Sequence, residues 1–170
     1  MERMWSPWRS QFINAPKDDT ASDSPFTIAF NQPERDRETY LLHRGRLGFI
    51  ILNLYPYNAG HLLVLPVRQV ADLLELTPEE GSELFALTQF GVRIVQRAMN
   101  PHGFNIGMNL GRPAGAGIVN HVHLHIVPRW NGDTNFMPVM DETRVISEQM
   151  ETAFAALWEA KEQLLKEEEG

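Results

Sequence analysis

The heptapeptide HVHLHIV, residues 121–127, places three of the chain's six histidines at alternate positions, each followed by an apolar residue. Alternation with a period of two is typical of a β-strand, in which successive side chains point to opposite faces of the sheet. We therefore expect His121, His123 and His125 to share one face of a strand. The apolar residues between them should pack into the core behind that face.

The histidine row is compatible with three interpretations. It could be the polar face of a half-buried strand, although three histidines within five residues are improbable in a chain with only six. It could hold a metal, because two histidines at positions i and i+2 of a strand can both ligate zinc; a third ligand then has no evident source. It could also catalyse group transfer, because one imidazole can act as a nucleophile while its neighbours orient it, stabilise charge or move protons.

The segment just before the row favours the third interpretation. NLGRPAGAGIVN, residues 109–120, is rich in glycine and alanine, which allow backbone N–H groups to approach and surround an anion. Such a loop alone is equally typical of an ordinary hairpin connection. Its direct continuation into a row of imidazoles is the stronger signal, and it indicates nucleophilic catalysis.

The rest of the sequence predicts an α+β fold with a largely antiparallel sheet. A long helix is the clearest element, with Thr77 as N-cap, Pro78 in the first turn, Glu80 completing a capping box, and Asn100 at the end. The other expected elements are a short helix over 26–30 capped by Ser24, two strands within 39–56, strands over 61–67, 103–111 and 121–128, and a final amphipathic helix over 146–164.

Composition limits the classes of partner. The net charge of −7, from 15 basic and 22 acidic residues, disfavours binding to nucleic acid or to anionic membranes. The chain has no cysteine, which excludes disulfides and cysteine-ligated metals. Its apolar runs are too short to span a bilayer, and the first ten residues lack the apolar segment of a signal peptide. We expect a cytoplasmic protein.

These motifs together resemble the histidine triad (HIT) superfamily. HVHLHIV fits the family's His-x-His-x-His-x-x signature with apolar x, and NAGHLLVLP, residues 58–66, is similar to its upstream segment, whose histidine aligns with His61. The resemblance covers roughly residues 41–129. The flanking segments MWSPWRSQFI and VPRWNGDTNFMPV are similar to the bacterial branch that resembles diadenosine tetraphosphate phosphorylase.

The resemblance implies a five-stranded, largely antiparallel sheet with a long central helix and a C-terminal helix, usually in a homodimer. We expect residues 1–170 to form a single HIT-like domain. It would comprise an N-terminal extension over 1–38, a core over 39–130, and a C-terminal loop and helix over 131–170.

The resemblance also implies nucleotidyl transfer, in which dinucleoside polyphosphates or related adenylates are cleaved by phosphorolysis or hydrolysis. His123 would attack the α-phosphorus and His125 would contact the α-phosphate. His121 and His61 would lie behind His123 and support its tautomer. The expected phosphate ligands are Asn109 and the backbone of Ala116, Gly117 and Ile118. Asn53 would bind the ribose hydroxyls, or would simply complete a turn at a strand end.

Two departures from the family pattern bear on chemistry and cofactors. Gly117 and Ile118 occupy positions where many members have Gln-Ser or Gln-Thr, which fits a phosphorylase no worse than a hydrolase. Ser24 and Thr27 occupy the places of two cysteines that help bind structural zinc in many bacterial members, with His61 and His121 as candidates to complete that site. Because hydroxyls are poor zinc ligands, we expect no zinc there. No cofactor should be required, although magnesium could accompany a polyphosphate.

Two other functions remain open at this point. The protein could be a nucleotide-binding regulator with little turnover, which a turnover rate would distinguish from an enzyme. It could also be a metal-binding protein that uses the histidine row, which metal analysis would reveal.

Overall fold

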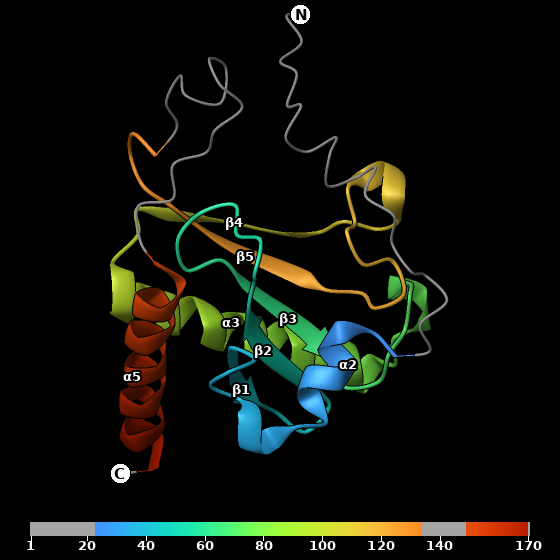
Figure 1. Ribbon diagram of the computed structural model, residues 1–170, viewed down its shortest axis with the longest axis horizontal. Helices are drawn as coiled ribbons and strands as arrows, with labels where there is room; N and C mark the ends of the chain where they lie inside the picture. The colour runs from blue at the N-terminus through green and yellow to red at the C-terminus, as the bar shows by residue number, and fades with distance from the viewer. Residues whose placement is uncertain (1–22, 134–148, 170) are drawn as a thin grey trace, which may run out of the picture.

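The computed structural model describes residues 23–133 and 149–169, which contain a five-stranded, antiparallel sheet. The strands lie in the order β1-β2-β3-β5-β4, so that β1 and β4 form the two edges (Figure 1). Their bounds are β1 Leu41–Arg44, β2 Gly48–Leu52, β3 Leu62–Pro66, β4 Gly103–Met108 and β5 Leu124–Arg129. The α+β architecture expected from the sequence is confirmed.

Three α-helices accompany the sheet within the described residues: α2 (Pro25–Phe30), α3 (Pro78–Met99) and α5 (Met150–Glu169). Short 3₁₀ turns occur at Pro33–Arg35, Leu73–Glu75 and Arg112–Ala114. The helix α3 begins with the predicted capping box, in which the side chains of Thr77 and Glu80 each accept the other's backbone N–H. It ends at Asn100, which adopts the left-handed conformation common after helices.

Alternation along the strands divides the core between the two faces of the sheet. Ile50, Val64 and Ile126 belong to a cluster packed under α3 and α5, whereas Phe49 and Leu63 belong to a cluster packed against α2. Figure 1 shows α2 and α3 on opposite sides of the sheet. The site described below lies on the α2 face, because His125 pairs with Leu63 across strands and directly opposed residues share a face.

The strand β5 is shorter than the sequence predicts, because it begins at Leu124. The register that pairs Val64 with Leu124 would bring Pro66 opposite Val122, and proline has no N–H to donate to the ladder. The Val122 N–H bonds instead to the Val70 carbonyl at 2.7 Å. His125 therefore lies in the sheet, whereas His121 and His123 lie in the segment just before it, which corrects the expectation of one strand for all three.

Gly60 turns the chain into β3 immediately before His61. Its φ is +72°, and a Cβ at this position would lie 2.5 Å from the Met99 sulfur. We expect Gly60→Ala to lower the free energy of unfolding by about 1–3 kcal/mol, because the left-handed backbone and the crowded surroundings both disfavour a methyl group. Urea denaturation measures this change.

Gly81→Ala is the matched control for that substitution. Gly81 lies in α3, where nothing lies within 4 Å of an added Cβ, so alanine should leave stability unchanged or raise it by less than about 1 kcal/mol. Equal losses in the two variants would contradict the proposed role of the Gly60 turn.

Candidate active site

The histidines predicted to act together meet on the α2 face of the sheet. His121 and His61 are fully buried, His123 is 7% exposed and His125 is 8% exposed. The ring centroids of His123 and His125 are 5.0 Å apart, and those of His61 and His125 are 5.1 Å apart. The rings of His61, His125 and His123 thus form one cluster, which His121 joins through its backbone carbonyl, and the hydrogen bonds define what each ring can do.

His123 is held as a base with an available ring nitrogen. Its Nδ1 lies 2.9 Å from the backbone carbonyl oxygen of His121. Because a carbonyl only accepts, the proton of the neutral ring is on Nδ1 and the lone pair is on Nε2. Within the described residues, no hydrogen bond engages that Nε2. The protonation pattern is the one that a nucleophilic imidazole needs.

His125 is the opposite tautomer to His123, with its proton on Nε2, because of its hydrogen bond with His61. The Tyr57 backbone N–H donates to His61 Nδ1 at 2.9 Å, so the proton of neutral His61 is on Nε2. That Nε2 lies 2.9 Å from His125 Nδ1 and donates to it. The proton of neutral His125 is therefore on Nε2. Two successive hydrogen bonds, from the Tyr57 N–H to His61 and from His61 to His125, thus leave His125 with an Nε2–H donor next to the lone pair of His123.

The structure places His61 differently from the prediction. It lies behind His125 and not behind His123, and among the described residues its ring bonds to Asn53, Tyr57 and His125 rather than to Ser24 or Thr27. The hydroxyls of those two residues lie 2.6 Å and 3.4 Å from His121 Nδ1. His61 therefore could not complete a metal site there. The reason is topological. His61 lies just before the start of β3, whereas Ser24 bonds to Gln69, which follows the other end of that strand at Pro66.

His121 has both ring nitrogens engaged. Its Nε2 donates to the Pro66 carbonyl at 2.8 Å, and its Nδ1 faces the Ser24 hydroxyl at 2.6 Å. It contributes its backbone carbonyl, rather than its ring, to His123. His121 thus meets His123 through its backbone carbonyl, and its predicted role in supporting the His123 tautomer stays a prediction.

Asn109 and Tyr57 border the outer side of His125. The Tyr57 ring stacks on the His125 ring at a centroid distance of 5.5 Å and an interplanar angle of 17°. The Asn109 Nδ2, an amide donor, lies 3.4 Å from His125 Nε2 and 3.5 Å from the Tyr57 hydroxyl oxygen. Because His125 Nε2 carries a proton, the Asn109 amide should present its oxygen to that nitrogen. Asn109 thus borders His125 Nε2, and its predicted role in binding phosphate stays a prediction.

The glycine-rich loop supplies fewer backbone donors than predicted. Gly111 and Gly115 have φ values of +76° and +94°, which fold the loop back on itself. The Ala116 N–H is already used, because it donates to the Gly111 carbonyl at 3.2 Å, so Ala116 is a poor candidate for binding phosphate. The amides of Gly117 and Ile118 donate no hydrogen bond within the described residues. They stay the loop's candidates for an anion.

Asn53 follows the end of β2, beside His61. Its side-chain oxygen accepts the Tyr55 N–H at 3.0 Å, which is the turn-completing role, and its Nδ2 lies 3.3 Å from His61 Nδ1. These contacts place Asn53 at the edge of the cluster, where it helps to set the His61 tautomer. Its predicted role in binding ribose hydroxyls stays a prediction.

Burial lowers the pKa of both His121 and His123, because a charged imidazole is poorly solvated there; their hydrogen bonds to carbonyls oppose this in part. Below the ordinary histidine pKa of about 6.5 the unfolded chain therefore binds more protons than the folded one. We expect the free energy of unfolding to decrease as pH falls from 7.5 to 5.5. Thermal unfolding across this range measures it.

His123→Gln tests the source of that pH dependence. The variant cannot gain a proton at position 123, so its stability should depend less steeply on pH than that of the wild type. An unchanged slope would assign the dependence to other groups, such as His43, whose pKa burial also lowers.

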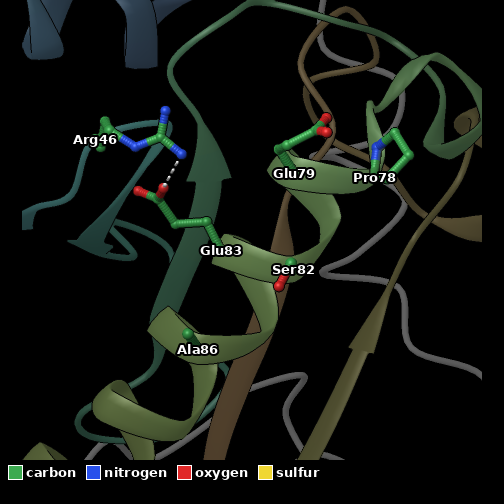
Figure 2. A pocket seen from close by; sticks show the side chains of 6 residues that line it. All are labelled: Arg46, Pro78, Glu79, Ser82, Glu83 and Ala86. Atoms are coloured by element: carbon green, nitrogen blue, oxygen red, sulfur yellow. Dashed lines mark ion pairs between the residues drawn. The ribbon is translucent and has the colours of Figure 1, made fainter.

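A separate surface hollow lies on the α3 side of the sheet, away from the histidines. Figure 2 shows Arg46 and Glu83 facing each other there, and their charged atoms are 3.9 Å apart. The Glu83 carboxylate accepts the Leu47 and Gly48 N–H groups at 2.6 Å and 3.2 Å. Glu83 therefore fixes the β1–β2 hairpin to α3 through these two backbone bonds, and the residues that line the hollow include no histidine.

The sequence analysis did not anticipate Tyr57, Phe26 or Gln69. Tyr57 had a weak signal, as an aromatic residue in a turn four positions before His61. The Phe26 ring lies 5.9 Å and 5.6 Å from the rings of His121 and His123, but its sequence indicated only a helix. Gln69 had no signal, because only the fold brings it to Ser24, 45 residues earlier.

Comparison with known proteins identifies similar chains. The HIT domain profile matches residues 35–132. The AP-4-A phosphorylase of Mycobacterium tuberculosis (strain H37Rv) is 43% identical over 150 residues, which are 86% of this chain and 77% of that protein. The asymmetrical bis(5'-nucleosyl)-tetraphosphatase of Schizosaccharomyces pombe is 37% identical over 93 residues, which are 55% of this chain and 50% of that protein.

Solved structures share the fold. A zinc-bound histidine triad family protein from Mycobacterium smegmatis superposes with a TM-score of 0.62 and 28% sequence identity, covering 76% of this chain and 88% of that one.

Proposed function

The chain belongs to the HIT domain family, and from this membership we propose that it is an enzyme that transfers nucleotidyl groups from dinucleoside polyphosphates through a covalent intermediate on His123. The observation that carries the proposal is the pair of opposite tautomers. His123 presents a lone pair on Nε2 and its neighbour His125 presents an N–H, and both are fixed by hydrogen bonds before any substrate arrives.

In the first step His123 Nε2 attacks the α-phosphorus of a dinucleoside polyphosphate. A P–N bond forms, and the bond from phosphorus to the bridging oxygen of the next phosphate breaks. The electron pair leaves on that oxygen with the departing nucleotide, which is ATP if the substrate is diadenosine tetraphosphate. The His125 N–H can stabilise the charge that develops on the phosphoryl oxygens.

In the second step an acceptor oxygen attacks the same phosphorus and the P–N bond breaks. The electron pair returns to His123 Nε2, and the acceptor's proton is lost to solvent. With inorganic phosphate as acceptor the second product is ADP, and with water it is AMP. The described residues contain the nucleophile that both reactions share, and Gly117 and Ile118 favour neither acceptor over the other.

Turnover of diadenosine tetraphosphate, with and without inorganic phosphate, tests the proposal. ADP and ATP formed only when phosphate is present would identify a phosphorylase, whereas AMP and ATP formed without it would identify a hydrolase. The failure of wild-type protein to turn over this substrate or an adenosine phosphoramidate would instead favour a nucleotide-binding regulator.

A metal centre in the histidine row has less support. In the row, both ring nitrogens of His121 are bonded, to Pro66 and Ser24, and Nδ1 of His125 is bonded to His61, which leaves His123 Nε2 as a single candidate ligand rather than a set. Among the described residues, no three histidine or carboxylate side chains are grouped so that they could hold a metal ion.

We also propose that Ser24 and Thr27 hold no structural zinc and that turnover needs no cofactor beyond magnesium carried by the polyphosphate. Both hydroxyls are committed to hydrogen bonds, from Ser24 to His121 and from Thr27 to Gln69. Elemental analysis of protein purified without chelator should find much less than one zinc per chain. One tightly bound zinc per chain would contradict this proposal.

We propose a homodimer in which the β4 edges of two copies meet. β4 lies at the open edge of the sheet, and Ile106 and Leu110 on or just after it are 50% and 42% exposed. We expect Ile106→Lys to shift the protein from dimer to monomer in sedimentation velocity, because it would bury charges at the interface. Leu74→Lys, at a residue that is 90% exposed elsewhere, is the control. A monomeric wild type would refute the dimer.

Within the described residues, no helix is both long and apolar enough to cross a membrane. The cytoplasmic location, the absence of a nucleic-acid partner and the single-domain organisation stay predictions.

A further inference from the structure

We propose that Ser24 is a positioning residue of this active site, whose hydroxyl holds His121 in one orientation and tautomer so that His121 can hold the Nδ1–H of His123. The effect on catalysis rests on the proposed role of His123 as nucleophile. The proposal gives the short helix α2, which precedes the residues 35–132 matched by the HIT domain, a part in the chemistry.

The hydrogen bonds around His121 have one consistent direction. The Pro66 carbonyl can only accept, so His121 Nε2 carries the proton and Nδ1 carries the lone pair. The Ser24 hydroxyl, 2.6 Å from Nδ1, must then be the donor. The same Oγ accepts the Thr27 N–H at 3.1 Å as the N-cap of α2. One buried hydroxyl therefore caps the helix and binds the imidazole.

Gln69 leaves the Ser24 proton available for His121. The Gln69 side-chain oxygen accepts the Ser24 backbone N–H at 2.7 Å and the Thr27 hydroxyl at 2.9 Å. Because the Thr27 proton points to Gln69, the 3.1 Å contact between the two hydroxyls does not need the Ser24 proton. The network of Ser24, Thr27, Gln69 and His121 is thus satisfied with the Ser24 proton on the imidazole.

His121 needs this support because the sheet does not provide it. The segment that contains His121 and His123 precedes β5, and proline at position 66 prevents the ladder from continuing. The segment is held by the Val122 N–H bond to Val70, by the two bonds of the His121 ring, and by Phe26, which packs against both imidazoles. α2 supplies two of these supports.

The loss of Ser24 would affect the reactivity of His123 through the backbone carbonyl of His121. If the His121 ring loses its anchor, the carbonyl that accepts from His123 Nδ1 is no longer fixed, and His123 can place its proton on Nε2. That tautomer has no lone pair for the phosphorus. The loss should therefore appear in kcat, while KM changes little, since Ser24 is fully buried and does not meet the substrate.

Ser24→Gly tests the proposal, because glycine replaces serine as an N-cap at a cost of only a few tenths of a kcal/mol but supplies no donor. We expect kcat for diadenosine tetraphosphate to fall about 10- to 100-fold, as for a small displacement of a reacting group. Ser24→Thr keeps the hydroxyl and should retain most of the activity. Thr77→Gly removes the equivalent cap of α3, on the other face of the sheet, and should leave kcat unchanged.

The nitrogen-15 spectrum of the histidine rings provides a readout that does not depend on turnover. In wild-type protein, His121 should carry its proton on Nε2 and His123 on Nδ1. In Ser24→Gly, His123 should become a mixture of tautomers. A purely structural role for Ser24 would lower stability without changing these spectra.

The outcomes separate this proposal from the proposed function. Wild-type protein with His121 protonated on Nδ1 would overturn the Ser24 proposal without any variant, as would Ser24→Gly with wild-type kcat. An equal fall of kcat in Thr77→Gly would also overturn it. If wild-type protein shows the expected tautomers but turns over no dinucleoside polyphosphate, the proposed function fails and the tautomer result stands.

Discussion

His123→Ala should abolish turnover of diadenosine tetraphosphate, with a fall in kcat of roughly 10⁴-fold or more, as expected when a covalent nucleophile is removed. The physical reason is that His123 Nε2 carries a lone pair that no hydrogen bond from a described residue engages. His121 has both nitrogens bonded, and His61 and His125 are bonded to each other, so that no neighbouring imidazole can replace His123.

The binding of nucleotide should survive that substitution. The candidate phosphate ligands are Asn109, His125 and the loop amides, which alanine at position 123 leaves in place. Calorimetry with ATP should therefore give an affinity within a few-fold of that of the wild type. His102→Ala is the matched control, because His102 is an exposed histidine whose ring meets the Asn131 N–H outside the cluster. Wild-type kcat in His123→Ala would disprove the assignment of the nucleophile.

His125→Leu should lower kcat by roughly 10²- to 10³-fold, the range observed when one donor to a developing negative charge is removed. Leucine fills the space beside Tyr57 but offers no N–H to the phosphate. His125→Gln retains a donor at a similar reach and should recover part of the loss. Steady-state kinetics with both variants measures the value of the N–H apart from the volume of the ring.

His61 should couple to His125 in a double-mutant cycle. His61 acts on the substrate only through His125, so His61→Ala should reduce kcat less than His125→Leu does. The double variant should be about as slow as His125→Leu alone, because the loss of His61 can have no further effect once the His125 ring is absent. Additive losses would show that His61 acts independently of His125.

The sequence predicted the elements that depend on local patterns. The capping box at Thr77 and Glu80 predicted the start of α3, and short apolar runs bounded by turn residues predicted the strands. It overestimated β5, because the end of that strand is set by Pro66 on a partner strand and not by the residues of the strand itself.

The site could be predicted as a set of residues but not as a set of hydrogen bonds. The motif predicts that His61 lies near the histidine row, but it does not indicate which histidine His61 contacts. The register of β3 against β5 places His61 next to His125. The sequence suggested that the Ala116 N–H could bind phosphate. In the structure the loop folds back on itself, and this N–H donates to the Gly111 carbonyl. The contact between Ser24 and His121 spans 97 residues, so no local pattern could reveal it.

Trapping the covalent intermediate tests the central claim most directly. Wild-type enzyme mixed with excess diadenosine tetraphosphate in the absence of phosphate would be quenched within one turnover at alkaline pH, which preserves the P–N bond, and analysed by mass spectrometry of the intact chain and its peptides. The account predicts one adenylyl group per chain, located on His123 and absent from His123→Ala. An active enzyme with no adduct, or an adduct on His121, His125 or another residue, would contradict it.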